Sequence, residues 1–341
     1  MNEIIASGDW LPLVFAFLMG FSMLVYALLD GYDLGVGLLV SRANDEEKNI
    51  MIASIGPFWD ANETWLVLGV GLLLVAFPVA HGVILSSLYI PVAIMLTGII
   101  FRGVSFDFRS KAHTSHRKFW NNAFFAGSLV TAVSQGYMLG AYILGFDHSA
   151  MGIAFSILTG LALASGYSLI GACWLIMKTE GALQLRAIHW AKMSLFGAIA
   201  AIAIVSLATP LVSPRIFDKW FSMPEMLYLS PIPILTGFLV LSLFYVLSKL
   251  PKPADRHCWL PFMLTILTAI LCFIGLAYSF YPFIVPETVN SKGILIVDAA
   301  SALGSLMIIL VGALVVIPCL LAYTFFAYKV FHGKATALRY D

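Results

Sequence analysis

The chain has 341 residues, of which 61% are hydrophobic and only 11% are charged, and its formal net charge is +1. A water-soluble globular protein usually carries about 25% charged residues, so this composition excludes an ordinary soluble enzyme. We expect a protein that lives in a lipid membrane and has no nucleic-acid partner.

Apolar stretches long enough to span a bilayer recur along the whole chain. A helix needs roughly 20 mostly apolar residues to cross about 30 Å of hydrocarbon. Six stretches reach this length without a charge, and three more do so when a few polar residues are allowed. We predict an all-α polytopic protein with nine transmembrane helices in a single membrane domain, residues 1–341. The expected helices lie at about 10–40, 50–78, 81–101, 121–146, 151–177, 190–214, 226–248, 258–286 and 299–331.

The basic residues fall on one side of this arrangement. Of the 19 Lys and Arg residues, 16 lie in the alternate loops that include the C-terminus, and 3 lie in the other loops. Cytoplasmic loops carry the excess of Lys and Arg. We therefore predict an N-terminus outside and a C-terminus in the cytoplasm. The longest cytoplasmic loop is expected at Arg102–Trp120.

Two pairs of acidic residues lie within the first two predicted helices. Asp30 and Asp33 belong to the first helix, and Asp60 and Glu63 to the second. Each pair has i, i+3 spacing, which places its carboxyls on one helical face. Both pairs lie on the order of 15 Å from the loop that joins the two helices. The sequence predicts four carboxyl groups at one level, reachable from the cytoplasm.

Placing these acids inside a membrane costs free energy, and this favours a functional reason for their presence. An ionised Asp at the bilayer centre costs roughly 2.5–3.5 kcal/mol on insertion scales. Carboxyls in such a place can load and release protons, so a proton or cation path is the sharper interpretation. A proton- or cation-coupled secondary transporter would use the same groups, although no second acidic pair follows in the later helices. A purely structural role, as hydrogen-bonded pins between helices, is the third alternative. Ser134 and Gln135 are expected to donate hydrogen bonds between helices.

Haem iron in a membrane subunit needs His or Met ligands at membrane depth. None of the seven histidines lies in the middle of a predicted helix, and the chain has no HxxxH or CxxC metal spacing. We expect no cofactor or metal to be ligated by this chain. The histidines are His81, His113, His116, His148, His189, His257 and His332.

Several long motifs carry a family resemblance. They are DGYDLGVG (30–37), GPFWDANETWLVLG (56–69), FRGVSFDFRSK (101–111) and WLIMKTEG (174–181), followed by a looser match from YPFIVPETV (281–289) to YKVFHGK (328–334). With these runs the chain resembles cytochrome bd-type quinol oxidase subunit II along nearly its whole length. The KTEG run and the compact length are more similar to the cyanide-insensitive branch.

The resemblance implies one half of a bacterial inner-membrane complex. The expected architecture is two four-helix bundles plus one helix. The partner, subunit I, would carry haems b and d and the quinol-oxidising site. This chain would supply a cytoplasmic proton path and oxygen access. A quinone bound to this chain and a small single-helix subunit are further possibilities of the family.

The site residues follow from the motifs. The proton path would comprise Asp30, Asp33, Asp60 and Glu63, together with Asp107 from the third motif. Arg102 and Asp107 are expected at the cytoplasmic end of the third helix, near the mouth of the path or as an ion pair at the membrane surface. Two tryptophans in the second motif, Trp59 and Trp65, are expected to support the acids by packing.

Overall fold

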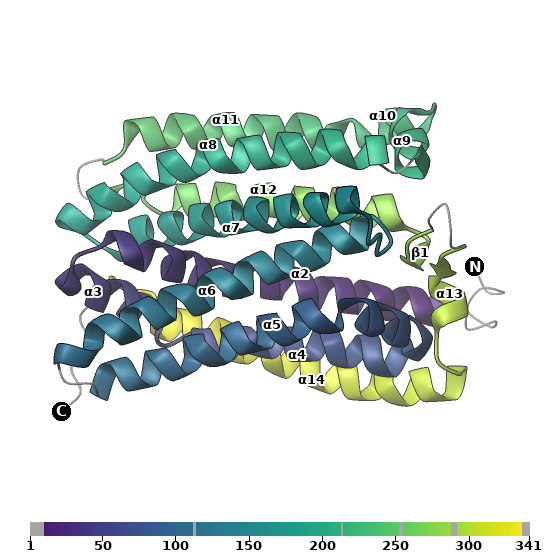
Figure 1. The fold of residues 1–341 in the computed structure, drawn as a ribbon, viewed down its shortest axis with the longest axis horizontal. Coiled ribbons are helices and arrows are strands. Elements are labelled where there is room, and N and C mark those ends of the chain that lie inside the picture. The colour runs from purple at the N-terminus through teal and green to yellow at the C-terminus, as the bar shows by residue number, and fades with distance from the viewer. Residues whose placement is uncertain (1–9, 112–113, 213, 252–254, 288–291, 336–341) are drawn as a thin grey trace.

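The structure is a computed structural model that describes residues 10–111, 114–212, 214–251, 255–287 and 292–335. Long helices run side by side along its longest axis (Figure 1). The first half contains α2 (Trp10–Leu39), the 3₁₀ turn η1 (Val40–Arg42), α3 (Asp45–Ile55), α4 (Trp59–Ala76), α5 (Pro78–Lys111), α6 (Thr114–Ile143) and α7 (Ala150–Lys178). The second half contains α8 (Gly181–Val212), α9 (Pro214–Phe221), α10 (Glu225–Leu229), α11 (Pro231–Lys249), α12 (Leu260–Phe280), α13 (Ile296–Ala299) and α14 (Leu303–Val330).

A small antiparallel pair of strands, β1 (Phe283–Val285) and β2 (Ile294–Leu295), interrupts the otherwise helical chain. Among the described residues, seven helices are long and apolar enough to cross a membrane, or eight if α3 and α4 form one span. The protein is therefore an all-helical polytopic membrane protein.

The second predicted helix, 50–78, is broken. α3 and α4 meet at an angle of 49° across Gly56, Pro57 and Phe58. Proline has no amide hydrogen and its ring collides with the preceding turn, so a helix that reaches Pro57 ends there. The Asn44 side chain begins α3 by accepting a hydrogen bond from the Glu47 amide at 2.9 Å, and the Glu47 carboxylate accepts one from the Asn44 amide at 3.0 Å.

The expectation of a long loop at Arg102–Trp120 is wrong. α5 continues through this region to Lys111, and α6 begins at Thr114. Hydropathy marks where apolar residues stop, but a helix can continue past that point when its charges find partners. Arg109 has such partners: its guanidinium donates to the Asn121 side chain at 2.5 Å and to the Asn49 side chain at 2.7 Å.

α6 has the length of a membrane span but too many polar residues to pass as one by composition. The structure places it between α5 and α7 (Figure 1). The hydroxyl residues in its middle point inward: Ser128, Thr131 and Ser134 are buried. Polar residues that face neighbouring helices are compatible with a position inside a membrane bundle.

α2 and α7 approach so closely that only glycine fits at their crossing. A Cβ atom on Gly35 would overlap the carbonyl oxygen of Tyr167, and one on Gly171 would overlap the backbone of Gly35. This contact holds the glycine face of α2 against α7, which is the usual use of small residues between membrane helices.

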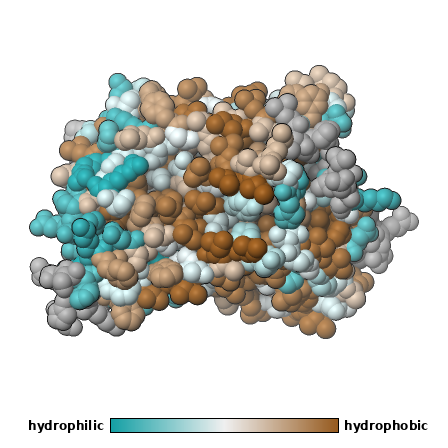
Figure 2. All heavy atoms as spheres, viewed as in Figure 1, coloured by the Kyte–Doolittle hydropathy of each residue, from teal (hydrophilic) through white to brown (hydrophobic). Residues whose placement is uncertain are grey.

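One end of the molecule collects most of the described basic residues, and we call it the basic end. It comprises α3, the α5–α6 and α7–α8 connections and the tail after α14; Figure 2 shows the hydrophilic residues gathered mainly there. The Lys178 ammonium donates to the carbonyls of Phe331 at 2.6 Å and Gly333 at 3.1 Å. Lys334 pairs with Asp255 at 2.8 Å, and this contact, with a hydrogen bond from Gln184, holds the pKa of Asp255 below its usual value.

The α2–α7 contact gives a first prediction. Gly35→Ala would push the new methyl group into the Tyr167 backbone, and overpacking of this kind costs about 1–3 kcal/mol. We expect a lower midpoint of thermal unfolding for the purified protein. Gly237→Ala on α11 is the control, because a Cβ there meets nothing within 4 Å. Equal stability of the two variants would contradict the close contact.

Candidate functional site

Two acidic residues of α2 lie at the centre of the helix bundle. The side chains of Asp30 and Asp33 have no solvent exposure. Arg102 of α5 lies beside them and is only 2% exposed. Its Nη1 atom is 2.6 Å from Oδ1 of Asp30, so the two groups form a buried ion pair.

Glu63 of α4 is the second acidic partner of Arg102. Its Oε1 atom accepts a hydrogen bond from Nη2 of the arginine. Glu63 keeps 22% of its side chain exposed, unlike the aspartates of α2. The guanidinium therefore ties α2, α4 and α5 together, and one of its partners reaches the surface of the chain.

Asn62 is the residue that contacts Asp33. Its amide nitrogen donates to Oδ2 of Asp33 at 2.8 Å and to the Tyr32 hydroxyl at 3.0 Å. Tyr328, near the end of α14, lies with its hydroxyl 2.6 Å from that of Tyr32 and donates to Oδ1 of Asn62 at 3.4 Å. The helices α2, α4 and α14 thus meet at the side-chain amide of Asn62.

The donors and acceptors of this group form a closed ring. Because the Tyr328 hydrogen points to Asn62, the short contact between the two hydroxyls must use the hydrogen of Tyr32. The Asn62 amide completes the ring by donating back to Tyr32. Its second hydrogen is then directed at Asp33, so the ring fixes which side of the amide faces the acid.

Aromatic rings enclose the two tyrosines. Trp174 stacks on Tyr32 with centroids 4.1 Å apart, and Phe58 stacks on Tyr328 at 4.6 Å. The Lys178 ammonium lies over the Trp174 ring at 5.0 Å. This packing restrains the positions of the Tyr32 and Tyr328 rings, and therefore of their hydroxyl groups.

A second polar group lies one turn of α2 away from Asp30. Gln135 of α6 donates to the Tyr26 hydroxyl at 2.6 Å and accepts from the Tyr167 hydroxyl at 2.7 Å. The predicted interhelical hydrogen bond of Gln135 is confirmed, and it joins α6 to α2 and α7.

Each buried aspartate keeps an oxygen that could hold a proton. Within the described part of the chain, Oδ2 of Asp30 and Oδ1 of Asp33 have no hydrogen-bond partner. A carboxyl that is fixed through one oxygen and open at the other can accept and release a proton without losing its place.

The two remaining acids of the predicted path lie elsewhere. Asp60 and Asp107 are exposed on the surface of the chain. The common level of the four carboxyls stays a prediction, but Asp60 is not buried with the other acids. Asp60 and Glu63 lie about 60° apart around α4, so Glu63 faces Arg102 while Asp60 is on the exposed side of the helix. Asp60 heads an exposed stripe of α4 that continues through Val67, Val70 and Leu74.

Arg102 also differs from its expected place. It lies inside α5 and not at the end of that helix, since nine further helical residues follow it. Its partners are Asp30 and Glu63, so it is not part of an ion pair at the membrane surface. Hydropathy could not show this, because the arginine directly follows the apolar stretch.

The two tryptophans pack against neighbouring rings. Trp65 is fully buried and contacts Phe21 edge-on at 6.0 Å, and Trp59 lies on Phe106 at 5.2 Å.

Sequence reasoning missed Asn62, Tyr32 and Tyr328. Asn62 stands between Asp60 and Glu63 in the second motif, and its position there was the available signal. Tyrosines in membrane helices are too common to stand out, so the pairing of Tyr32 with Tyr328 needs three-dimensional information.

The described histidines lie at helix ends or on the surface. Five are exposed, and His81 is half-buried three residues from the edge of α5. His113 lies outside the described residues. Among the residues that the structure describes, no group of three His, Cys, Asp or Glu side chains could hold a metal ion.

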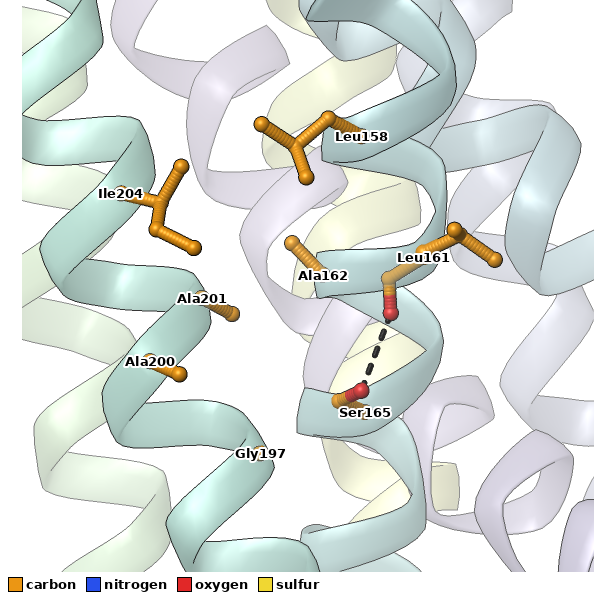
Figure 3. A pocket seen from close by; sticks show the side chains of 8 residues that line it. All are labelled: Leu158, Leu161, Ala162, Ser165, Gly197, Ala200, Ala201 and Ile204. Carbon is orange, nitrogen blue, oxygen red and sulfur yellow. Dashed lines mark hydrogen bonds between the residues drawn. The ribbon is translucent and has the colours of Figure 1, made fainter.

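A shallow groove between α7 and α8 is apolar (Figure 3). Its only hydroxyl, that of Ser165, donates to the Leu161 carbonyl at 3.0 Å. The groove offers no titratable group, which leaves the acids around Arg102 as the candidate site. The lining residues are Leu158, Leu161, Ala162, Ser165, Gly197, Ala200, Ala201 and Ile204.

Comparison with known proteins gives consistent matches. A family described as cytochrome bd terminal oxidase subunit II matches residues 11–331. Cytochrome bd-I ubiquinol oxidase subunit 2 of Escherichia coli strain K12 is 27% identical, over 94% of this chain and 93% of the relative. A probable cytochrome oxidase subunit 2 of Haemophilus influenzae is 29% identical, over 96% and 94%. A chain in the structure of bd oxidase from Geobacillus thermodenitrificans has the same fold, with a TM-score of 0.77 over 94% of this chain and 98% of that chain at 16% identity.

The buried ion pairs predict the effect of removing the arginine. Arg102→Gln would leave Asp30 and Glu63 without a cation in a place of low dielectric constant, and breaking a buried pair in this way costs about 3–5 kcal/mol. We expect a strongly lowered midpoint of thermal unfolding, or no assembled protein. Arg186→Gln is the control, because its pair with Glu47 is 42% exposed on the arginine side and such pairs contribute little. A similar small loss in both variants would argue against the central role of Arg102.

The ring of Asn62 predicts a second, smaller effect. Tyr328→Phe would remove the donor to Oδ1 of Asn62 and leave a buried amide oxygen unsatisfied, at a cost of about 1–3 kcal/mol. The thermal unfolding midpoint should fall. Tyr323→Phe, on an exposed part of the same helix, should leave it unchanged. Equal unfolding midpoints of the two variants would mean that the hydrogen-bond ring does not contribute to stability.

Proposed function

Since the chain belongs to the cytochrome bd terminal oxidase subunit II family, we propose that it is the haem-free half of a quinol oxidase complex that reduces oxygen to water. The E. coli relative is named as a subunit of a ubiquinol oxidase, and a second subunit is implied by that name. We assign haems b and d and the oxidation of quinol to subunit I. The exposed and terminal positions of the described histidines support this assignment. On the KTEG run we place the chain in the cyanide-insensitive branch.

The proposed topology has nine spans in one membrane domain, arranged as two four-helix bundles and one further helix. α6 is the span that composition alone leaves out, and its inward polar residues support its inclusion. The basic end would face the cytoplasm and the opposite end the outside of a bacterial inner membrane.

The face formed by α4, α5 and α14 is the proposed contact with subunit I. α14 has very few buried residues, and the exposed stripe of α4 begins at Asp60. A carboxyl group on an exposed stripe of a membrane helix is expensive in lipid, so a protein partner is the better neighbour. Asp107 is exposed on α5 in the same part of the molecule.

We assign the proton path to the exposed acids of this face and to the buried acids behind them. Protons would enter from the basic end, pass Asp107 and Asp60, and reach Glu63, which is partly exposed and touches Arg102. Asp30 and Asp33 form the buried end, each with an oxygen free to take a proton in the described part of the chain. The single observation that carries this proposal is the position of Glu63 between the exposed and the buried acids. Oxygen access and a bound quinone remain assignments from the family.

The path predicts the behaviour of a charge-neutral variant. Asp60→Asn should slow oxygen consumption by on the order of tenfold or more, because a carboxyl that transfers protons is replaced by a group that cannot. Absorption bands of the purified complex would show whether haem content and assembly are intact. Asp218→Asn on α9, an exposed acid at the opposite end, is the control. Unchanged oxygen consumption in a fully assembled Asp60→Asn complex would favour a structural role for the acids.

A further inference from the structure

The segment Pro214–Leu229 joins α8 to α11 at the end of the molecule opposite the basic end (Figure 1). It contains α9 and α10 and an unusual number of exposed large apolar side chains. Met223, Leu227 and Tyr228 are 68%, 64% and 77% exposed. Phe217, Phe221 and Met226 are exposed as well. A loop in water would turn such residues inward, since a contiguous exposed apolar patch marks a surface that contacts something else.

The inward side of this segment is already occupied. Ile216 is buried in a cluster with Phe280, and the Trp220 ring nitrogen donates to the Ser279 hydroxyl at 2.8 Å. The Lys219 ammonium donates to the Tyr278 carbonyl at 2.7 Å. These contacts fix the segment against the end of α12, so its apolar side cannot rotate into the bundle.

The surface next to the segment is the lipid-facing side of the protein. α8 from residue 193 to 212 and α11 from residue 231 to 248 contain no charged residue. Their exposed side chains are large and apolar, among them Leu207, Phe238 and Leu241. The apolar groove between α7 and α8 opens on α8, the helix that leads into α9 (Figure 3). Its outermost lining residue on that helix, Ile204, lies about 12 Å below the end of α8.

A protein partner is a poorer candidate for this patch. The exposed acids Asp60 and Asp107 lie on α4 and α5, and Figure 1 places α8 and α11 at the opposite edge of the molecule from α4, α5 and α14. The chain enters Pro214–Leu229 from the uncharged part of α8 and leaves it into the uncharged part of α11.

We propose that Pro214–Leu229 lies in the plane of the membrane, at the boundary between headgroups and acyl chains of the leaflet at this end. Phe217, Leu227 and Tyr228 enter this boundary, as aromatic and aliphatic residues of interfacial helices do over about 5–10 Å. The occupant of this face is phospholipid, and the segment is a membrane anchor in place of an aqueous loop.

A photocrosslinking experiment tests the inference in the full complex in its native membrane. Leu227→p-benzoylphenylalanine is irradiated, and the intact mass of the purified chain is measured. We expect adducts with the mass of a phospholipid, several-fold more abundant than for His148→p-benzoylphenylalanine in the exposed α6–α7 loop at the same end. Tyr228 is the second position, in case the first variant does not assemble.

The other outcomes overturn the inference. A protein adduct at Leu227 would make the segment a docking surface for another chain. Equal lipid labelling at Leu227 and His148, or none at either Leu227 or Tyr228, would make the segment an aqueous loop. None of these results depends on whether the acids carry protons, so the proposed path stands or falls separately.

Discussion

The pairing of Arg102 with two carboxylates is the interaction on which the arrangement of the first three spans depends. A carboxylate without a partner is expensive inside a bundle, and a planar guanidinium with five donors can satisfy acids on two different helices. Because Arg102 meets Asp30 of α2 and Glu63 of α4, it fixes α5 against both of these helices. The break at Pro57 has a matching consequence, since it starts α4 at the register that turns Glu63 inward.

The sequence alone predicted the class of protein, most of the spans and the acids of the site. Apolar runs report the environment of a helix, and a charge within such a run is visible without any structure. Two things could not be read in this way. The depth of Arg102 was hidden because it directly follows the apolar run of α5, and its partners are distant in sequence. Asp60 faces outward although it is only three residues from Glu63, because the border of the bundle passes between them on α4, and i, i+3 spacing does not locate that border.

Polar groups without charge complete the site and also escape sequence analysis. Asn62, Tyr32 and Tyr328 come from three helices, and the value of each depends on the other two. Their ring orients a single amide toward Asp33. Two surfaces of the molecule also differ in charge. The α4–α5 side carries the exposed carboxyls of Asp60 and Asp107, whereas residues 193–212 of α8 and 231–248 of α11 are uncharged.

Tyr328 belongs to α14, which follows the other described helices in the chain, and this order has a consequence for biosynthesis. Until α14 inserts, Oδ1 of Asn62 lacks the hydrogen bond from Tyr328, and the amide is held only through its nitrogen, by Tyr32 and Asp33 of α2. The Lys178 contacts to Phe331 and Gly333 are also made only after α14 has been synthesised. The hydrogen-bond ring that orients the Asn62 amide toward Asp33 therefore closes only after α14 is in place. A chain that stops before α14 retains a buried amide oxygen without its donor.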